Sequence, residues 1–417
     1  MTADVEHLLR TEAPQVLGAL VRRFGRFDIA EDAVQEALLA ASRAWPADGV
    51  PENPRSWLVR IGYRRMVDLL RADQARRRRE QEAGVAELAM QEPARQASPP
   101  QESDDSLALL LLCCHPALSA TSQVALTLRA VGGLTTAEIA HAYGTAESTM
   151  ATRISRAKQQ LVRAGARFTP PTDADRDSRV AAVMQVLYLI FNEGYTASTG
   201  GRLARVDLTK EAIRLTRMLR DRLPGDPEVT GLLALMLLTE SRRPARTGGE
   251  EELVPLEEQD RTQWDPGLIR EGTELIDSVW SRREVGPYQL QAAIAAVHAT
   301  AASPQQTDWP QIAALYLWLE RLTPTAPVRL SRVVAVAQAY GPARGLALLD
   351  DLNRRYRLDQ EPLTRQRERA VRAHLLQMTG DAAAAARLYR EAATLTGNQV
   401  ERRYLLDRAD RLSGQVR

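Results

Sequence analysis

The sequence predicts an all-α protein, in which a helical bundle, a linker and a helix-turn-helix unit precede an array of helical pairs. Alanine, leucine and arginine are abundant, while aromatic residues make up only 5% of the chain. This composition favours packed helices over sheets. Hydrophobic residues account for 44% of the 417 positions, which is enough to fill real cores. The length suggests roughly two to four domains, because one domain takes about 150 residues.

Composition also excludes several classes of protein. The net charge is +2, so any nucleic-acid surface must be local. The two cysteines, Cys113 and Cys114, are adjacent and suit neither a disulfide nor a metal site, which fits a reducing cytoplasm. The five histidines are scattered without ligand spacing. No signal peptide and no membrane-spanning apolar run is evident. We therefore expect a cytoplasmic protein without a metal, a cofactor or a membrane segment.

Residues 1–75 form the first predicted domain. Two helices are expected within residues 5–45, and Asp28 with Glu31 would form a capping box at the start of the second. An acidic cluster surrounds this start; it consists of Asp28, Glu31, Asp32 and Glu36. Taken alone, the cluster is more typical of a solvated face that complements the helix dipole.

A third helix is predicted to begin at the Asn53-Pro54 step. On a helical wheel, one indole and three guanidiniums fall within an arc of about 60°. They belong to Trp57, Arg60, Arg64 and Arg71. Such a face suits single-stranded or melting DNA, because bases stack on the ring and phosphates pair with arginine. The alternative is a basic surface helix whose Trp57 covers the edge of a core.

Residues 76–105 combine a charge run with prolines and few large apolar side chains, which predicts a flexible linker with a short helical start.

Residues 106–165 form the next predicted domain. Their sequence is again typical of helices and ends in a helix-turn-helix pattern. Thr135 or Thr136 can cap the first helix with Glu138 as the capping-box partner, and Gly144 suits the turn.

The second helix of this pattern is expected from about residue 146 to 161. Its inner face carries Met150, Ile154, Ala157 and Leu161, and its outer face carries Ser148, Thr149, Thr152, Arg153, Arg156 and Gln159. Hydroxyls and arginines together suit a helix that reads DNA. An ordinary amphipathic hairpin with a solvated basic face would show the same pattern.

After a short linker at residues 166–177, residues 178–417 are expected to form helical pairs. Ala385, Tyr389 and Ala393 recur every four positions, as in the second helix of a tetratricopeptide repeat. Residues 242–266 are the exception, because they are polar and lack a helical period. These residues could form a short hairpin or an ordinary surface loop.

No nucleophile-base pair and no phosphate-binding glycine loop is present in the sequence, so we expect no catalytic residue and no enzyme.

The motifs together resemble an extracytoplasmic-function sigma factor of bacterial RNA polymerase. The segment "FDIAEDAVQEALLAA" resembles region 2.2, "NPRSWLVRIGYRRMVDLLR" resembles regions 2.3 and 2.4, and "LTTAEIAHAYGTAESTMATRISRAKQQL" resembles region 4.2. The resemblance implies core polymerase binding by the four acids of the cluster. It implies recognition of the −10 promoter element by Trp57, Arg60, Arg64 and Arg71. Recognition of the −35 element falls to Ser148, Thr149, Thr152, Arg153 and Arg156.

Residues 178–417 resemble the tetratricopeptide-like extension of one subgroup of these sigma factors, for example at 180–198 and 308–324. The implied partners are bacterial core RNA polymerase and promoter DNA, and the array is a candidate site for a regulatory protein or ligand. The subgroup leads us to expect that the extension supports activity. Two other functions also fit parts of the pattern: a stand-alone helix-turn-helix regulator, and a repeat adaptor that binds a peptide but not DNA.

Overall fold

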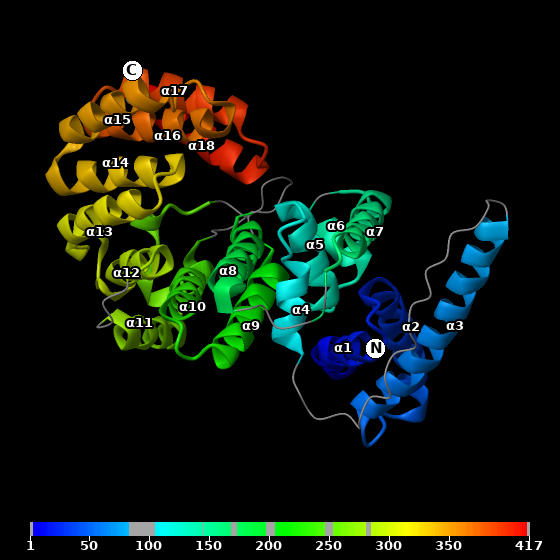
Figure 1. The fold of residues 1–417 in the computed structure, drawn as a ribbon. Coiled ribbons are helices and arrows are strands. Elements are labelled where there is room, and N and C mark those ends of the chain that lie inside the picture. Colours follow the sequence, from blue (N-terminus) through cyan, green and yellow to red (C-terminus); the bar gives the residue numbers. More distant parts are fainter. Residues whose placement is uncertain are drawn as a thin grey trace. The chain divides into compact units, whose positions relative to one another are not determined.

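The computed structural model describes residues 3–82, 105–143, 145–166, 168, 173–196, 205–246, 253–280 and 285–414. The regular elements in this part of the chain are α-helices and short 3-10 helices, so the predicted all-α class is confirmed (Figure 1). The fold separates into two compact units, Met1–Leu189 and Ile190–Arg417.

The first unit holds the two predicted DNA-binding segments. Its helices are α1 (Ala3–Phe24), α2 (Phe27–Asp48), α3 (Pro54–Glu82), α4 (Ser106–Cys113), α5 (Ala120–Ala130), α6 (Thr136–Ala142), α7 (Glu147–Arg163) and the first part of α8 (Asp173–Tyr195). Helix α3 continues into the segment predicted as a linker, and residues 83–104 of that segment lie outside the described residues.

Helices α1, α2 and α3 pack into a bundle around Leu17, Leu20 and small side chains of α2. Gly62 of α3 allows the closest approach, because a Cβ there would lie 2.9 Å from a methyl carbon of Leu20. Helix α3 begins at Pro54, as the Asn53-Pro54 step predicted, and the Asn53 side chain caps it by accepting a hydrogen bond from the Ser56 N–H.

The predicted capping box at the start of α2 is wrong. The N-cap is Arg26, which makes no side-chain cap bond, and the Asp28 carboxylate instead accepts hydrogen bonds from the Arg26 guanidinium. A neighbouring cation competes better for this carboxylate than the backbone does, because charge-assisted pairs are the stronger bonds.

Helices α4 to α7 form the second half of this unit. The capping box of Thr135 and Glu138 at the start of α6 is present as predicted, while Gly144, predicted at the turn, lies outside the described residues. Helix α4 is apolar on all sides and buries Cys113 and Cys114 as free thiols. Burial raises the pKa of the Cys114 thiol to about 12, so both cysteines serve as core residues.

The second unit is a series of stacked helix pairs. Its helices are α9 (Val206–Arg222), α10 (Pro227–Glu240), α11 (Pro266–Trp280), α12 (Pro287–Thr300), α13 (Trp309–Leu322), α14 (Ala326–Tyr340), α15 (Pro342–Tyr356), α16 (Pro362–Met378), α17 (Ala382–Leu395) and α18 (Gln399–Gly414). Short 3-10 helices η1 (Arg243–Ala245), η3 (Leu256–Glu258), η4 (Arg261–Gln263) and η5 (Pro304–Gln306) lie between them.

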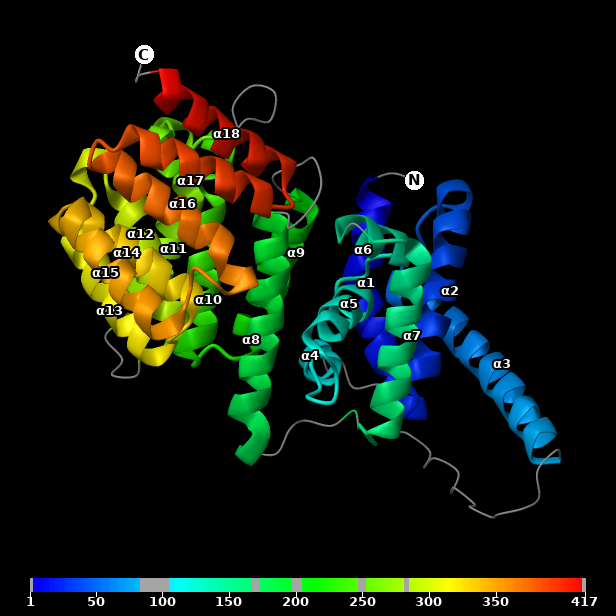
Figure 2. The same cartoon turned by 90° about the horizontal axis from the view of Figure 1, so that it is seen from above.

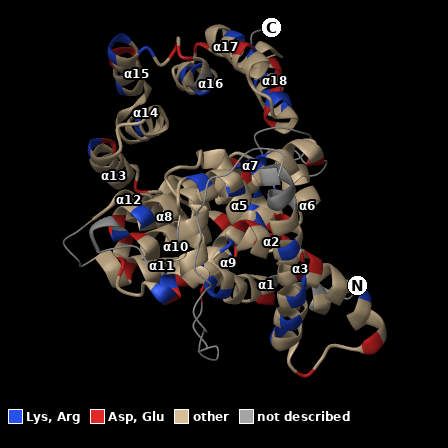
Figure 3. Ribbon diagram, turned by 45° about the vertical axis from the view of Figure 1, so that its right-hand side comes forward, with Lys and Arg blue, Asp and Glu red and all other residues tan. Residues whose placement is uncertain are grey.

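Proline sets the starts of many of these helices, because its fixed φ suits the first turn and its missing N–H is not needed there. Helices α10, α12 and α15 begin in this way at Pro227, Pro287 and Pro342. Gly341 joins α14 to α15 with a φ of 97°, which a residue with a side chain rarely adopts. Helices α13 to α18 follow one another along an arc (Figure 3).

Ala385, Tyr389 and Ala393 are buried in the core that α17 shares with α16 and α18, as their spacing predicted. The polar excursion at 242–266 contains η1, η3 and η4, and its residues 247–252 lie outside the described residues.

Within the described ranges, no helix is long and apolar enough to cross a membrane. The same ranges hold no group of three or more His, Cys, Asp or Glu side chains placed to bind a metal ion.

His298 of α12 gives the second unit a predicted pH dependence. The residue is 9% exposed, and its ring meets Trp309 edge-on with ring centroids 5.2 Å apart. Burial, together with the charges of Arg242 and Arg261, lowers its pKa from 6.5 to about 3. The folded pKa lies below the unfolded pKa, so protonation opposes folding. The stability is complete above about pH 6.5 and is lost as the pH falls towards 3.

We expect the free energy of unfolding of the wild type to fall between pH 6.5 and 4.5 by up to about 1.4 kcal/mol per pH unit from this residue. His298→Phe keeps an aromatic ring but cannot titrate, so its profile should be flatter. Urea unfolding at several pH values measures the difference. The exposed His141→Gln serves as the control and should follow the wild type. Parallel profiles for wild type and His298→Phe would remove His298 as the cause.

Candidate functional site

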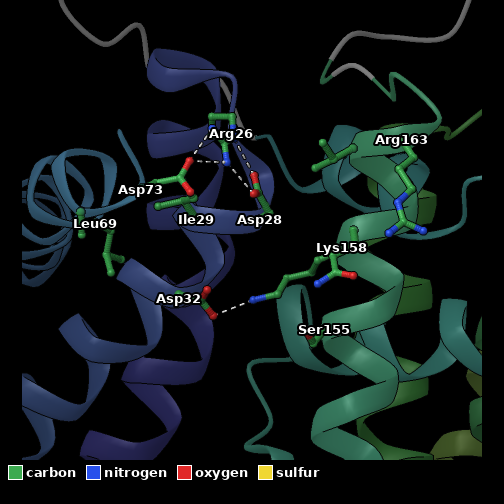
Figure 4. Close-up of a pocket in the computed structure, with 12 residues that line it drawn as sticks. Arg26, Asp28, Ile29, Asp32, Leu69, Asp73, Ser155, Lys158 and Arg163 are labelled. Carbon is green, nitrogen blue, oxygen red and sulfur yellow. Dashed lines mark hydrogen bonds and ion pairs between the residues drawn. The ribbon is translucent and has the colours of Figure 1, made fainter. Parts of the chain in front are cut away.

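The acidic cluster on α2 centres on Glu31, whose side chain is only 2% exposed. Two cations from the second half of the unit hold its carboxylate. The Arg129 Nε of α5 donates to Oε1 at 2.8 Å, and the Lys158 Nζ of α7 donates to Oε2 at 3.0 Å. The same ammonium donates to the Asp32 carboxylate at 2.6 Å (Figure 4). Helix α7 thereby lies against α2 as well as α5 (Figure 2).

The charges of this site offset one another. Burial alone would raise the pKa of the Glu31 carboxyl, but the Lys158 and Arg129 charges hold it below its usual value. Burial raises the pKa of Asp32, whose side chain is 57% exposed and shares Lys158 with Glu31. Taking Glu31 out of water would cost several kcal/mol without these partners. Helix α2 can therefore pack against α5 and α7 only because these two cations neutralise Glu31.

The other two acids of the cluster also have partners. Arg26 binds Asp28 through two hydrogen bonds and approaches Asp73 of α3 at 3.5 Å. Burial would raise the pKa of Asp28, but these bonds and the Arg26 charge lower it overall. Glu36 pairs with Arg65 of α3. The structure thus gathers Asp28, Glu31 and Asp32 near α7, whereas Glu36 faces α3.

A pocket of about 530 Å³ lies beside the Lys158 contact. Helices α2, α3 and α7 contribute its walls, which include Asp28, Asp32, Leu69, Asp73, Ser155, Lys158 and Arg163 (Figure 4). Its acidic lining comes from α2 and α3, while Lys158 and Arg163 come from α7. The acidic wall from α2 and α3 therefore faces a basic wall from α7.

A second set of contacts joins the two halves of this unit at α1 and α4. Arg22 pairs with Asp105, the residue before α4, and the Gln15 amide donates to the Ser106 hydroxyl at 3.1 Å. Gly18 is required between them, because a Cβ at this position would overlap the Asp105 side chain. Polar contacts therefore hold the halves together at two separate places.

The predicted −10 face of α3 is largely exposed. Arg60, Arg64 and Arg71 are open to solvent, and α3 carries a visible line of basic residues in Figure 3. Trp57 is half-buried, and its ring meets the buried Trp45 edge-on with centroids 5.6 Å apart. This contact matches the alternative in which Trp57 covers a core edge, but part of the indole stays accessible.

The predicted −35 face of α7 is also accessible. Ser148, Thr149, Thr152 and Arg156 are exposed, and Arg153 is half-buried. The Thr152 hydroxyl donates to the Ser148 carbonyl at 2.8 Å, which turns this hydroxyl inward along the helix. Met150, Ile154, Ala157 and Leu161 are buried as predicted.

Sequence reasoning missed Lys158 and Arg129, which carry the central contact. Lys158 does give a signal, because it lies four positions after Ile154 and three before Leu161, on the apolar stripe of α7. A lysine on such a stripe needs a buried partner of opposite charge. The sequence offered no means to choose that partner, which lies 127 residues away.

Comparison with known proteins places these halves in two families. Residues 8–77 match the family described as sigma-70 region 2, and residues 108–161 match sigma-70, region 4. Residues 179–280 match a family of unknown function, DUF6596. The chain belongs to the sigma-70 family. Its architecture is that of an extracytoplasmic-function sigma factor with a C-terminal helical extension.

An uncharacterized protein of Rhizobium meliloti (strain 1021) is 39% identical to this sigma factor over 422 aligned positions. The alignment covers 99% of the present chain and 97% of the relative. No solved structure matches the chain. The sigma-70 regions imply a factor that directs transcription initiation, binds core RNA polymerase and promoter DNA, and is not an enzyme.

The buried ammonium of Lys158 can be tested directly, because Lys158 and Lys210 are the only lysines of this sigma factor. Lys158 is 11% exposed in its side chain and paired twice, whereas Lys210 of α9 is exposed. We expect an amine-reactive ester to modify Lys210 at least about tenfold faster than Lys158, since a paired ammonium must first be released. Mass spectrometry of digested samples gives both rates from one experiment.

Lys210 is the internal control, since its rate corrects for pH and reagent. A Glu31→Gln, Asp32→Asn variant should bring the rate at Lys158 close to that at Lys210. Equal rates at the two lysines in the wild type would contradict the closed contact in solution.

Proposed function

We propose that this sigma factor binds core polymerase through the acidic cluster on α2, reads the −10 element with α3 and reads the −35 element with α7. The exposed basic and hydroxyl-bearing faces of α3 and α7 carry the proposal, because each offers the groups that DNA recognition needs. The two faces belong to the two sigma-70 regions in their usual order.

The burial of Glu31 adds a condition to this proposal. A carboxylate that is 2% exposed and held by Arg129 and Lys158 is not available to a polymerase. We infer that α5 and α7 separate from α2 before the cluster binds core polymerase. The chain would then exchange between a closed form and an open form, and only the open form would start transcription.

The role proposed for the C-terminal extension is to support this opening or to hold the open form. The extension follows region 4 directly along the chain, so it acts on region 4 at high effective concentration. A segment that binds the open form better than the closed form raises the open population by the ratio of its two affinities.

The −35 assignment predicts the effect of Arg156→Ala. Arg156 is exposed on α7 and has the reach of a base-reading side chain. Its loss should weaken binding of the polymerase holoenzyme to a promoter by about 1–3 kcal/mol if the guanidinium contacts a base edge. The measurement is promoter binding and run-off transcription with core polymerase. The free energy of unfolding should stay within about 0.5 kcal/mol of the wild type.

Arg403→Ala is the matched control, because it removes the same charge from an exposed position on α18. It should leave promoter binding unchanged. Equal losses for both variants would reduce the Arg156 effect to a general loss of positive charge. Unchanged binding for Arg156→Ala would remove this residue from the −35 face.

A fragment of residues 1–195, which keeps α8 whole, tests the extension. Helix α8 has to be kept, because Arg179 donates to the Leu111 carbonyl and Val183 is buried. We expect this fragment to fold, as judged by circular dichroism, but to yield less promoter-dependent transcript than the full chain. Without polymerase, the amine-reactive ester should modify Lys158 more slowly in the fragment than in the full chain, because the fragment lacks the extension that favours the open form. A fragment more active than the full chain would make the extension an inhibitor.

A further inference from the structure

The described part of the polar excursion reaches the inner side of the C-terminal array. Two adjacent carboxylates of η3 make the contact. Glu257 accepts a hydrogen bond from the Gln338 amide of α14 at 3.0 Å and lies 4.0 Å from the His374 Nε2 of α16. Glu258 accepts from the Arg408 Nη1 of α18 at 2.9 Å.

The three partners come from alternate helices of the arc. Figure 3 shows α14, α16 and α18 on its inner side and α13, α15 and α17 on its outer side. Gln338, His374 and Arg408 therefore point groups that can donate hydrogen bonds towards one common space. Helical arrays use such inner surfaces to bind extended ligands, because neighbouring repeats present side chains in a row.

The helices hold their side of the contact firmly. The Arg408 side chain is 16% exposed, its Nε is buried without a hydrogen-bond partner, and its Cζ lies 5.9 Å from the centre of the Tyr404 ring. Tyr389 of α17 lies beside this guanidinium, and burial raises the pKa of its phenol to about 12, so the ring stays neutral. A guanidinium held in place in this way is suited to an anionic ligand.

The loop holds its side loosely. The side chains of Glu257 and Glu258 are 50% and 49% exposed, and exposed ion pairs of this kind contribute only about 0–1 kcal/mol each. The rest of the loop has its own anchors: the Gln259 amide donates to the Val254 carbonyl at 3.0 Å, and Arg261 donates to the His298 carbonyl at 3.0 Å. The acidic turn can therefore leave the helices while the base of the loop stays in place.

We propose that the inner side of α14, α16 and α18 is a binding site for an acidic peptide of a partner protein. The Glu257-Glu258 turn occupies this site within the chain until such a peptide replaces it. The peptide class follows from the occupant itself, which is a short 3-10 turn with two neighbouring carboxylates and an apolar residue, Leu256, before them. The site consists of Gln338, His374, Tyr404 and Arg408, and the buried Tyr389 lies behind the guanidinium.

A fluorescent peptide with the sequence of residues 253–260, "LVPLEEQD", serves as the probe. The tethered turn competes at an effective concentration of about a millimolar, so the wild-type full chain should bind the peptide weakly. The Glu257→Gln, Glu258→Gln chain lacks the competing carboxylates. It should bind the peptide at least about tenfold more tightly by fluorescence anisotropy. A peptide with both glutamates replaced by glutamine should bind at least several-fold more weakly.

Arg408→Gln added to the double variant should abolish binding, whereas Arg403→Gln on the same helix should leave it unchanged. Gln338→Ala provides a second, milder change at the surface of α14 and should weaken binding several-fold without loss of the fold. Circular dichroism identifies any variant that fails to fold.

Equal binding of the peptide to the wild type and the double variant would overturn the proposal. The proposal would also fail if neither Gln338→Ala nor Arg408→Gln, each added to the double variant, weakened binding. A single-stranded oligonucleotide that displaces the peptide as well as the unlabelled peptide does would also overturn it, in favour of a phosphate site. The assay contains neither polymerase nor promoter, so its outcome is independent of the proposed function.

Discussion

The closed form of the first unit depends on one buried carboxylate. Glu31 is almost without solvent and is neutralised by an arginine and a lysine from two different helices. Removing one of these partners would leave an uncompensated buried charge, which is far more costly than removing the whole cluster. The contact is therefore specific: α5 and α7 must both be placed correctly, or α2 cannot bury Glu31 at all. When the halves separate completely, all three groups return to water and regain hydration, so full opening costs much less than a partial break.

The chain contains a second, weaker kind of ion pair, and the difference in exposure sets the difference in role. Glu258 and Arg408 form a pair in which the acid is half exposed, so water already screens much of the attraction. Glu31 and Lys158 form theirs with both groups largely out of water. The first kind is easily exchanged for a similar ligand from another molecule. The second kind is broken only when whole helices move.

Local signals in the sequence predicted what local chemistry determines. Asn53 and Thr135 cap their helices because each side chain needs only the backbone N–H three residues later. The buried face of α7 followed from the helical period alone. The expected Asp28 cap is absent, because the Arg26 guanidinium, two positions earlier, binds the carboxylate more strongly than the backbone does. Lys158 and Glu257 meet partners 127 and 81 residues away, and no periodicity specifies such a pairing.

Two of the four residues proposed to bind polymerase, Glu31 and Asp32, also close the unit, which links the two events. Glu31 and Asp32 cannot pair with Lys158 and with a polymerase at once, so each interaction lowers the affinity of the other by an equal factor. Any molecule that holds region 4 away from region 2 must therefore raise the affinity for polymerase, even if it never touches α2. A helical extension that follows region 4 along the chain can act in this way without a contact to DNA or to the acidic cluster. The effect of the extension would then depend on the ratio of its affinities for region 4 in the open and closed forms. Equal affinities for the two forms, however high, would not change the balance between them.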